Sequence, residues 1–268
     1  MKKIIAVAGM AALCLAACQS RAPLQQIAKG DELAFYNFTE PGTFEEGAYG
    51  LATLRVNDGV YHINVAQGDN TLWWGQWGDS YDDAVIDVDV AQTTERNENA
   101  FGVMCRVRGS MGQAREANPE LVAIMEDTPE ADPTEAADDD AAEQTPAPDE
   151  TAAVEQSTAE ASVGEGDGYL FLIQGTGSYA IMRARGRDVV PLVNWTASDQ
   201  IHAGPGSNHL RAVCAGNYLA LYVNEVFMAD VTDDTYTRGQ VGLAASAANR
   251  LGLRVEFDNL SISAVNTG

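Results

Sequence analysis

Three tryptophans that lie close together in the chain are the residues best suited to bind a sugar. Trp73, Trp74 and Trp77 are three of the four tryptophans, and Asp79 and Tyr81 follow them. Aromatic rings stack on the apolar C–H faces of sugars, while carboxylates and amides bind the hydroxyl groups. These five residues form our candidate glycan-binding set. The alternative is that the rings fill a core: in a strand, Trp73 and Trp74 point to opposite faces, so at least one should be buried.

Three aspartates in the same stretch suggest a weaker candidate site. Asp79, Asp82 and Asp83 carry carboxylate oxygens, which are the ligands that Ca²⁺ prefers. Carboxylates in loops are more often solvated, so calcium is a secondary hypothesis and no other cofactor is expected. The chain has no metal-binding helix pair, nucleophile elbow or phosphate-binding glycine loop. Catalytic residues therefore stay unassigned.

The N-terminal 20 residues read as an export signal. Lys2 and Lys3 precede a 14-residue apolar stretch that is too short to cross a bilayer as a helix. It ends in Leu15-Ala16-Ala17-Cys18, which resembles the lipobox of bacterial lipoproteins. The resemblance implies that residues 1–17 are removed, that Cys18 is acylated with chains such as palmitate, and that its partner is a lipid bilayer. Gln19 after Cys18 implies the outer membrane in a Gram-negative cell envelope, with residues 18–30 as a short tether.

The negative charge is concentrated in one segment. The chain has 39 Asp and Glu against 16 Lys and Arg, a net charge of −23, and Glu116 to Asp167 holds 17 of the acidic residues with no Lys or Arg. Five of the nine prolines also lie there and aromatic residues do not, so the segment cannot bury enough apolar surface to order its backbone. We expect residues 111–167 to be a disordered acidic insertion, and the remainder carries only −6. This balance argues against nucleic acid as a partner.

The sequences on both sides of the insertion look like strands. Phe101 to Arg108 precedes it and Gly168 to Gln174 follows it. A long loop adds closure entropy only slowly, so a hairpin tolerates such an insertion. We therefore predict one domain over residues 31–268, interrupted at 111–167. A linker between two small domains is the alternative, which the lack of a complete sandwich on either side disfavours.

The folded part has the alternating pattern of half-buried strands. Tyr61, Ile63 and Val65 share one parity, and Asn57-Asp58-Gly59 before them predicts a hairpin turn. Near the end, Leu253, Val255 and Phe257 keep one parity while Leu260 and Ile262 keep the other, which predicts a β-bulge near Asp258-Asn259. We find no convincing helical stripe outside the signal and the insertion. About a dozen strands predict an antiparallel sandwich.

Two cysteines remain once Cys14 leaves with the signal and Cys18 takes lipid. Cys105 and Cys214 both have inward parity on their strands. An exported pair favours a disulfide, provided that the Cα atoms approach within about 7 Å. The alternative is two buried free thiols.

Charged side chains show two further patterns. Arg106 and Arg108 are expected to share one strand face, and Arg183, Arg185 and Arg187 another. Such a face could be screened by the acidic insertion or could bind an acidic polysaccharide, and solvated strand edges are the default. His202 and His209 flank a glycine-rich loop and are expected to be loop or surface residues.

A series of short motifs, in order along the chain, resembles the concanavalin A-like lectin/glucanase superfamily. The motifs include Gly168-Tyr169-Leu170-Phe171, Leu192-Val193-Asn194-Trp195, Gly239-Gln240-Val241-Gly242-Leu243 and Phe257-Asp258-Asn259-Leu260. The nearest types are laminin-G-like and 3-keto-disaccharide-hydrolase-type domains. The resemblance covers roughly residues 33–265 and implies an all-β, two-sheet jelly-roll sandwich. Relatives carry Asn-Gly where this chain has Asn224-Glu225, so we expect a longer turn or one of another type there.

The resemblance is less specific for activity than for fold. Glucanases of the superfamily carry Glu-x-Asp-x-x-Glu on one strand, and the nearest match here runs from Asp87 to Gln92, with Asp89 in the middle and no final acid. We therefore interpret Asp87 and Asp89 as a solvated strand face. The first hypothesis is a non-catalytic lipoprotein that binds a glycan or an envelope partner. The alternatives are a glycoside hydrolase or lyase acting on 3-keto-glycosides or related sugars, and a structural spacer.

Overall fold

The computed structural model describes residues 21–68, 70–95, 97–109, 166–186, 188–248 and 252–267. The leader, Cys18 and almost all of the acidic insertion, as well as Arg187, lie outside these residues. Within the described part every regular element is a strand, and no helix there is long and apolar enough to cross a membrane. The expected all-β class is therefore confirmed.

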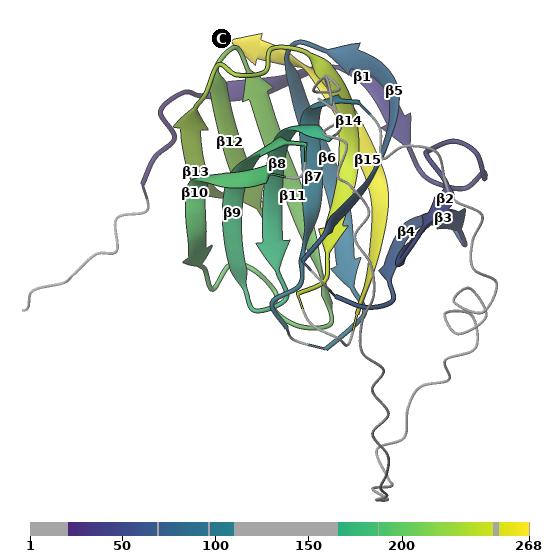
Figure 1. The fold of residues 1–268 in the computed structure, drawn as a ribbon. Coiled ribbons are helices and arrows are strands. Elements are labelled where there is room, and N and C mark those ends of the chain that lie inside the picture. Colours follow the sequence, from purple (N-terminus) through teal and green to yellow (C-terminus); the bar gives the residue numbers. More distant parts are fainter. Residues whose placement is uncertain are drawn as a thin grey trace, which may run out of the picture.

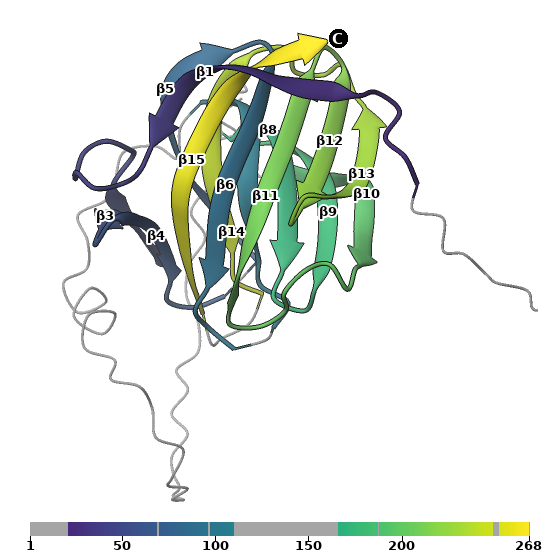
Figure 2. The ribbon, with the colours of Figure 1, turned by 180° about the vertical axis from the view of Figure 1, so that it is seen from behind.

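The strands form two antiparallel sheets packed face to face (Figures 1 and 2). The nine-stranded sheet has the order β13 (Val226–Thr232), β12 (Tyr218–Val223), β11 (Gly206–Ala215), β6 (Ala84–Gln92), β15 (Leu253–Thr267), β4 (Val60–Val65), β3 (Ala52–Asn57) and β2 (Gly47–Tyr49), with β1 (Ile27–Tyr36) paired to β15. The six-stranded sheet has the order β10 (Asp188–Ala197), β9 (Ser178–Arg185), β8 (Asp167–Gln174), β7 (Ala100–Arg108), β14 (Gly239–Ser246) and β5 (Leu72–Tyr81).

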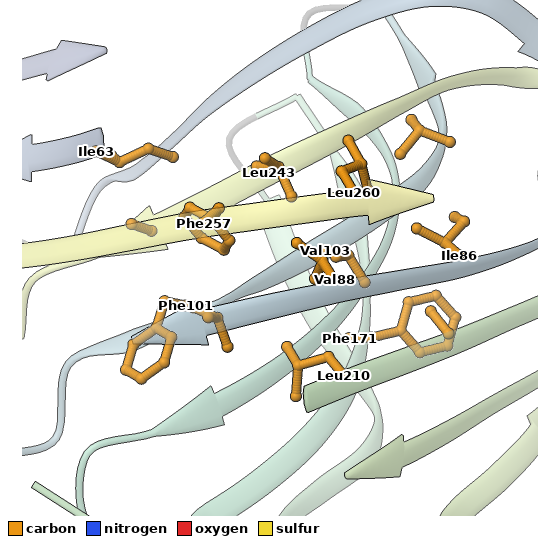
Figure 3. Packing of buried hydrophobic residues seen from close by; sticks show 14 of the residues in the cluster. Ile63, Ile86, Val88, Phe101, Val103, Phe171, Leu210, Leu243, Phe257 and Leu260 are labelled. Carbon is orange, nitrogen blue, oxygen red and sulfur yellow. The ribbon is translucent and has the colours of Figure 1, made fainter. Parts of the chain in front are cut away.

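The main core lies between the two sheets. Figure 3 shows Ile86, Val88 and Leu210 of the nine-stranded sheet meeting Val103 and Phe171 of the six-stranded sheet. All five are fully buried. Each comes from an alternating strand, so one face of each sheet is removed from water, which is the dominant favourable term in folding. The period-2 pattern in the sequence therefore identifies the inward faces.

The turn predicted before Tyr61 and the predicted bulge are both present. Asp58 and Gly59 have φ values of 52° and 82° and join β3 to β4, as a two-residue hairpin turn requires. Asn259 has a φ of 52°, and the pairing of β15 with β6 shifts between Asp258 and Ser261. The bulge turns Leu260 back into the core after Phe257, and both side chains are fully buried.

The turn at Asn224-Glu225 differs from our expectation. It is a two-residue turn between β12 and β13, with φ of 50° at Asn224 and 65° at Glu225. The prediction of a longer turn or one of another type was wrong, because side chains hold the strained backbone. Asn224 Oδ1 accepts the amide of His209 at 2.9 Å, and the carboxylate of Glu225 lies 3.0 Å from Nη1 of Arg211.

The acidic insertion joins two neighbouring strands. β7 and β8 pair antiparallel from Ala100↔Gln174 to Arg108↔Asp167. The two flanks of the insertion therefore share one sheet, and the single interrupted domain stays a prediction. The tether boundary is different: β1 begins at Ile27, inside the 18–30 region, and pairs with β15 from its first residue.

The predicted disulfide is confirmed. Cys105 of β7 and Cys214 of β11 are bonded, with their Cα atoms 6.8 Å apart. Because β7 belongs to the six-stranded sheet and β11 to the nine-stranded sheet, the bond crosses the core and joins the two layers.

Candidate functional site

The three clustered tryptophans of β5 do not form one aromatic platform. Trp73 is partly exposed, packs against the main core and has a buried indole nitrogen. Trp74 points to the opposite side of the sheet and is 8% exposed. The expectation of opposite faces, with at least one ring buried, is confirmed. The reason is the alternation of the strand, which separates adjacent side chains.

Trp74 belongs to a second apolar cluster on the outward face of the six-stranded sheet. Its neighbours there include Met104, Leu170 and Ala244. The backbone of Gly166, where the chain re-enters the sheet, lies so close that an added Cβ would come within 2.6 Å of the Trp74 ring. Gln76 accepts a hydrogen bond from the Trp74 indole at 3.4 Å and donates its own amide to the carbonyl of Gly109. The chain on the two sides of the insertion is therefore held near Trp74, at Gly166 directly and at Gly109 through Gln76.

Trp77 is the exposed member of the cluster. It is 43% exposed and lines an open groove together with Phe35, Tyr36 and Thr43. Burial, followed by the negative charge of Asp79, raises the pKa of Tyr36. Asp79 also contributes to the raised pKa of Tyr81, after burial and Tyr36. The structure therefore brings Trp77, Asp79 and Tyr81 to one corner, separate from Trp73 and Trp74.

The weak calcium candidates are engaged with arginines. Asp82 lies 2.9 Å from Nη1 of Arg238, and Asp83 lies 3.2 Å from Nη2 of Arg106. Asp83 also accepts the amide of Gly216 at 2.7 Å. Among the described residues, no group of three or more potential ligands is arranged to hold a metal ion.

The expectation that Arg106 and Arg108 share one strand face was wrong. Arg106 has a φ of 55° and is 2% exposed, so it lies inside the molecule while Arg108 is at the surface. Its guanidinium donates to the carbonyls of Asp82 at 2.9 Å and Tyr236 at 2.7 Å. The left-handed residue breaks the alternation of β7, which sequence parity alone does not reveal.

A pocket that sequence reasoning missed lies on the outward face of the six-stranded sheet. Its volume is about 250 Å³, and its wall includes Trp195, which is 38% exposed. Leu72, Ala100, Leu172 and Met182 on its wall belong to the outward cluster rather than the core. The wall also includes Asn70, Glu98, Gln174, Val189, Ser246 and Ala248.

The pocket combines an exposed aromatic ring with polar groups. Trp195 and Val189 come from the edge strand β10, and Gln174 comes from the end of β8. Gln174 is held in place because its amide donates to the carbonyl of Glu98 at 3.1 Å. An apolar wall with a few fixed polar groups is the usual composition of a small-molecule site. The sequence offered one signal for this pocket. Trp195 lies between two polar residues, Asn194 and Thr196, in a strand without the alternating apolar pattern of an inward face.

Asp87 and Asp89 do not form a simple solvated face. Both lie on β6 in the nine-stranded sheet, and Asp87 is 4% exposed. Asp87 lies 3.0 Å from Nζ of Lys29 and 2.6 Å from Nε of Arg211. His209 contacts both carboxylates, at 3.3 Å from Asp87 and 2.8 Å from Asp89. The solvated-face interpretation is therefore wrong for Asp87, because cationic side chains from β1 and β11 cover it.

This ion-pair network changes the acidity of its members. The hydrogen bond to Asp87 raises the pKa of His209, and the hydrogen bond to Asp89 and the charges of both carboxylates add to this. Burial opposes the shift, and the resulting pKa is about 9. Burial raises the pKa of Asp87, but hydrogen bonds from His209 and Lys29 and the charge of Arg211 outweigh it, so the pKa falls to about 2. His209 lies at a partly exposed position within β11. The network holds charges in fixed positions: Oδ1 of Asp87 faces His209 and Arg211, and Oδ2 lies 3.0 Å from Nζ of Lys29.

Comparisons with known proteins identify the fold. No family model and no curated protein matches the sequence. Among solved structures, a Bacillus subtilis protein of unknown function with a galectin-like fold gives a TM-score of 0.51 at 10% identity, covering 91% of this chain and 100% of that one. A Bacillus licheniformis β-glucanase gives 0.50 at 8% identity, covering 87% and 98%. The chain therefore has the galectin-like, concanavalin A-like sandwich fold that the sequence motifs indicated.

Proposed function

We propose that this protein is an envelope-anchored lipoprotein whose sandwich binds a glycan in the Trp195 pocket. The observation that carries the proposal is the exposed Trp195 ring beside Gln174 and Glu98. An indole face supplies a rigid apolar surface for the C–H face of a sugar, and the amide and carboxylate supply partners for its hydroxyls. A neutral, hydroxyl-rich glycan fits this composition.

The β-glucanase neighbour supports the proposal only at the level of fold. It shows this sandwich in a protein named for its action on a glucan. Identity of 8% transfers no residue role, and one fold hosts many functions. The pocket itself therefore has to carry the assignment.

Binding fits the pocket better than hydrolysis. Glycoside hydrolysis usually requires two carboxyl groups about 5 to 10 Å apart. The wall of the pocket supplies one, that of Glu98. Hydrolysis or lysis of a keto-sugar thus remains the competing hypothesis, and turnover of keto-glycosides by the wild-type protein would favour it.

The proposed anchor is the acylated Cys18. The apolar leader and the Leu15-Ala16-Ala17-Cys18 motif support it. One acyl chain binds membranes marginally and several chains anchor firmly. The test compares wild type with Cys18→Ser in a fractionated bacterial host: the wild type should sediment with membranes and incorporate labelled palmitate, and the variant should do neither.

The glycan proposal is tested with a panel of neutral and acidic polysaccharides in affinity electrophoresis, followed by calorimetry on the best oligosaccharide. Trp195→Ala should weaken binding at least tenfold. Trp77→Ala is the matched control, because it removes a similarly exposed indole from a different groove, and it should leave affinity unchanged. Loss of binding in Trp77→Ala with full binding in Trp195→Ala would place the site at the wrong tryptophan and overturn the assignment.

A further inference from the structure

The residues that precede β1 are fastened to the nine-stranded sheet by one buried carboxylate. The side chain of Asp230, on β13, has no exposed surface. Its Oδ1 lies 2.7 Å from Nη2 of Arg21, and its Oδ2 accepts the backbone amide of Leu24 at 2.6 Å. The chain is therefore held at Arg21 and Leu24, before any strand begins.

Tyr218 completes the attachment. Its hydroxyl donates to Oδ2 of Asp230 at 3.0 Å and lies 3.4 Å from the carbonyl of Gln25. Burial, and then the bond to Asp230, raises the pKa of Tyr218, so the phenol stays protonated and keeps donating. A buried carboxylate without partners is costly, and here a guanidinium, an amide and a phenol supply them.

The chain stays bound after the clamp. β1 starts at Ile27, which pairs with Thr267 of β15. Ile27 also packs against a third apolar cluster, on the nine-stranded sheet, which includes Tyr218 and Ala220 of β12. No long free segment therefore separates Arg21 from the folded domain.

The length of chain between the clamp and Cys18 is short. Only Gln19 and Ser20 lie between Cys18 and Arg21. Three residue steps span at most about 11 Å. An acyl group on Cys18 would hold the Arg21 end of the domain at that distance from the lipid interface.

We infer that the clamp at Asp230 makes the β12–β13 side of the sandwich a membrane-facing surface; this rests on the proposed lipid anchor. Figures 1 and 2 both show the N-terminal purple segment leaving the domain beside β13 and β10. Leu24, 66% exposed, belongs to the clamped segment, and Val226, 36% exposed, begins β13; both side chains suit contact with an apolar interface. The partner of the surface is the bilayer that holds the acyl chains.

The inferred orientation also determines where the Trp195 pocket lies relative to the membrane. β10, which carries Trp195, lies against β13 at the same edge of the sandwich. The Tyr179 hydroxyl of the adjacent β9 donates to the carbonyl of Met228 on β13 at 3.0 Å, which joins the two sheets there. The β10 wall of the pocket, which carries Trp195, is thus on the membrane-facing side, so the ligand is a glycan attached to, or lying on, the same membrane.

Fluorescence energy transfer tests the orientation in acylated, vesicle-bound full-length protein. A donor is attached at Val226→Cys, at the start of β13 and four residues before Asp230, or at Asp58→Cys, in the β3–β4 turn toward the opposite edge of the same sheet, with an acceptor on lipid headgroups. Transfer from position 226 should exceed transfer from position 58 at least threefold. Asp230→Asn should reduce this ratio toward one, and so should a 12-residue Gly/Ser insertion after Ser20, which leaves the fold intact.

The outcomes separate the inference from the proposal beneath it. Equal transfer from the two positions in membrane-bound protein would overturn the fixed orientation while leaving the anchor standing. Absence of the protein from the membrane fraction would overturn the anchor and the orientation together. Should Asp230→Asn fail to fold, Arg21→Ala releases the same contact from the surface side, and hydrogen exchange at the Leu24 amide should then rise at least tenfold.

Discussion

Cys105 and Cys214 bond the six-stranded sheet to the nine-stranded sheet across the core, although they lie 109 positions apart in the sequence. A crosslink over so long a loop restricts the unfolded chain strongly, and disulfides of this kind typically contribute about 2 to 5 kcal/mol. Reduction should lower the free energy of unfolding in urea by that amount. Cys105→Ser/Cys214→Ser is the control, since reductant should leave its unfolding curve unchanged. An identical midpoint for the oxidised and reduced wild type would contradict the prediction.

The network of Asp87 and His209 predicts a pH window for stability. The folded-state pKa of His209, about 9, lies above its ordinary value of 6.5, so its contribution is complete below pH 6.5 and is lost as the pH rises through 9. The folded-state pKa of Asp87, about 2, lies below its ordinary value of 3.8, so its contribution is complete above pH 3.8 and is lost as the pH falls through 2. The network should therefore stabilise most between about pH 4 and 6.5.

His209→Gln tests this window. Thermal melts of wild type and variant from pH 3 to 10 should differ most between pH 4 and 6.5 and converge above pH 9. The amide keeps hydrogen-bonding capacity but carries no charge, so it isolates the ionic part. A difference in melting temperature that stays constant from pH 5 to 10 would show that packing, rather than protonation, accounts for the effect.

Glu225 occupies a left-handed backbone conformation and binds Arg211 through its carboxylate. Glu225→Gly and Glu225→Ala both remove the ion pair, but only glycine relieves the backbone strain. We expect the glycine variant to be more stable than the alanine variant by about 1 kcal/mol in urea unfolding. Equal stabilities would mean that the turn relaxes to another conformation.

The sequence predicted the fold well because alternation and turn chemistry are local. Tyr61, Ile63 and Val65 lie inward because each is two residues from the next, and Asp58-Gly59 carries the turn within two residues. The disulfide was also accessible, since Cys105 and Cys214 are inward on their strands. These features depend on the spacing of residues along the chain, which can be determined from the sequence alone.

The candidate site was harder to predict because its residues are distant in sequence. Trp195 lines one pocket with Leu72 and Glu98 only because β10, β9, β8, β7, β14 and β5 assemble in that order. The adjacent tryptophans Trp73 and Trp74 gave a stronger local pattern, yet strand alternation sends one of them inward. Asp87 was misjudged for a similar reason, since Lys29 and Arg211 reach it from other strands.

The most direct test of glycan binding uses the four indole N–H signals in an NMR titration. The chain has four tryptophans, so each reports on one location: core for Trp73, outward cluster for Trp74, the separate groove for Trp77 and the proposed pocket for Trp195. Adding the best-binding oligosaccharide should shift the Trp195 signal saturably and leave the Trp73 signal in place, with single substitutions giving the assignments. Saturable shifts confined to Trp77, or no shift with any glycan of the panel, would contradict the account.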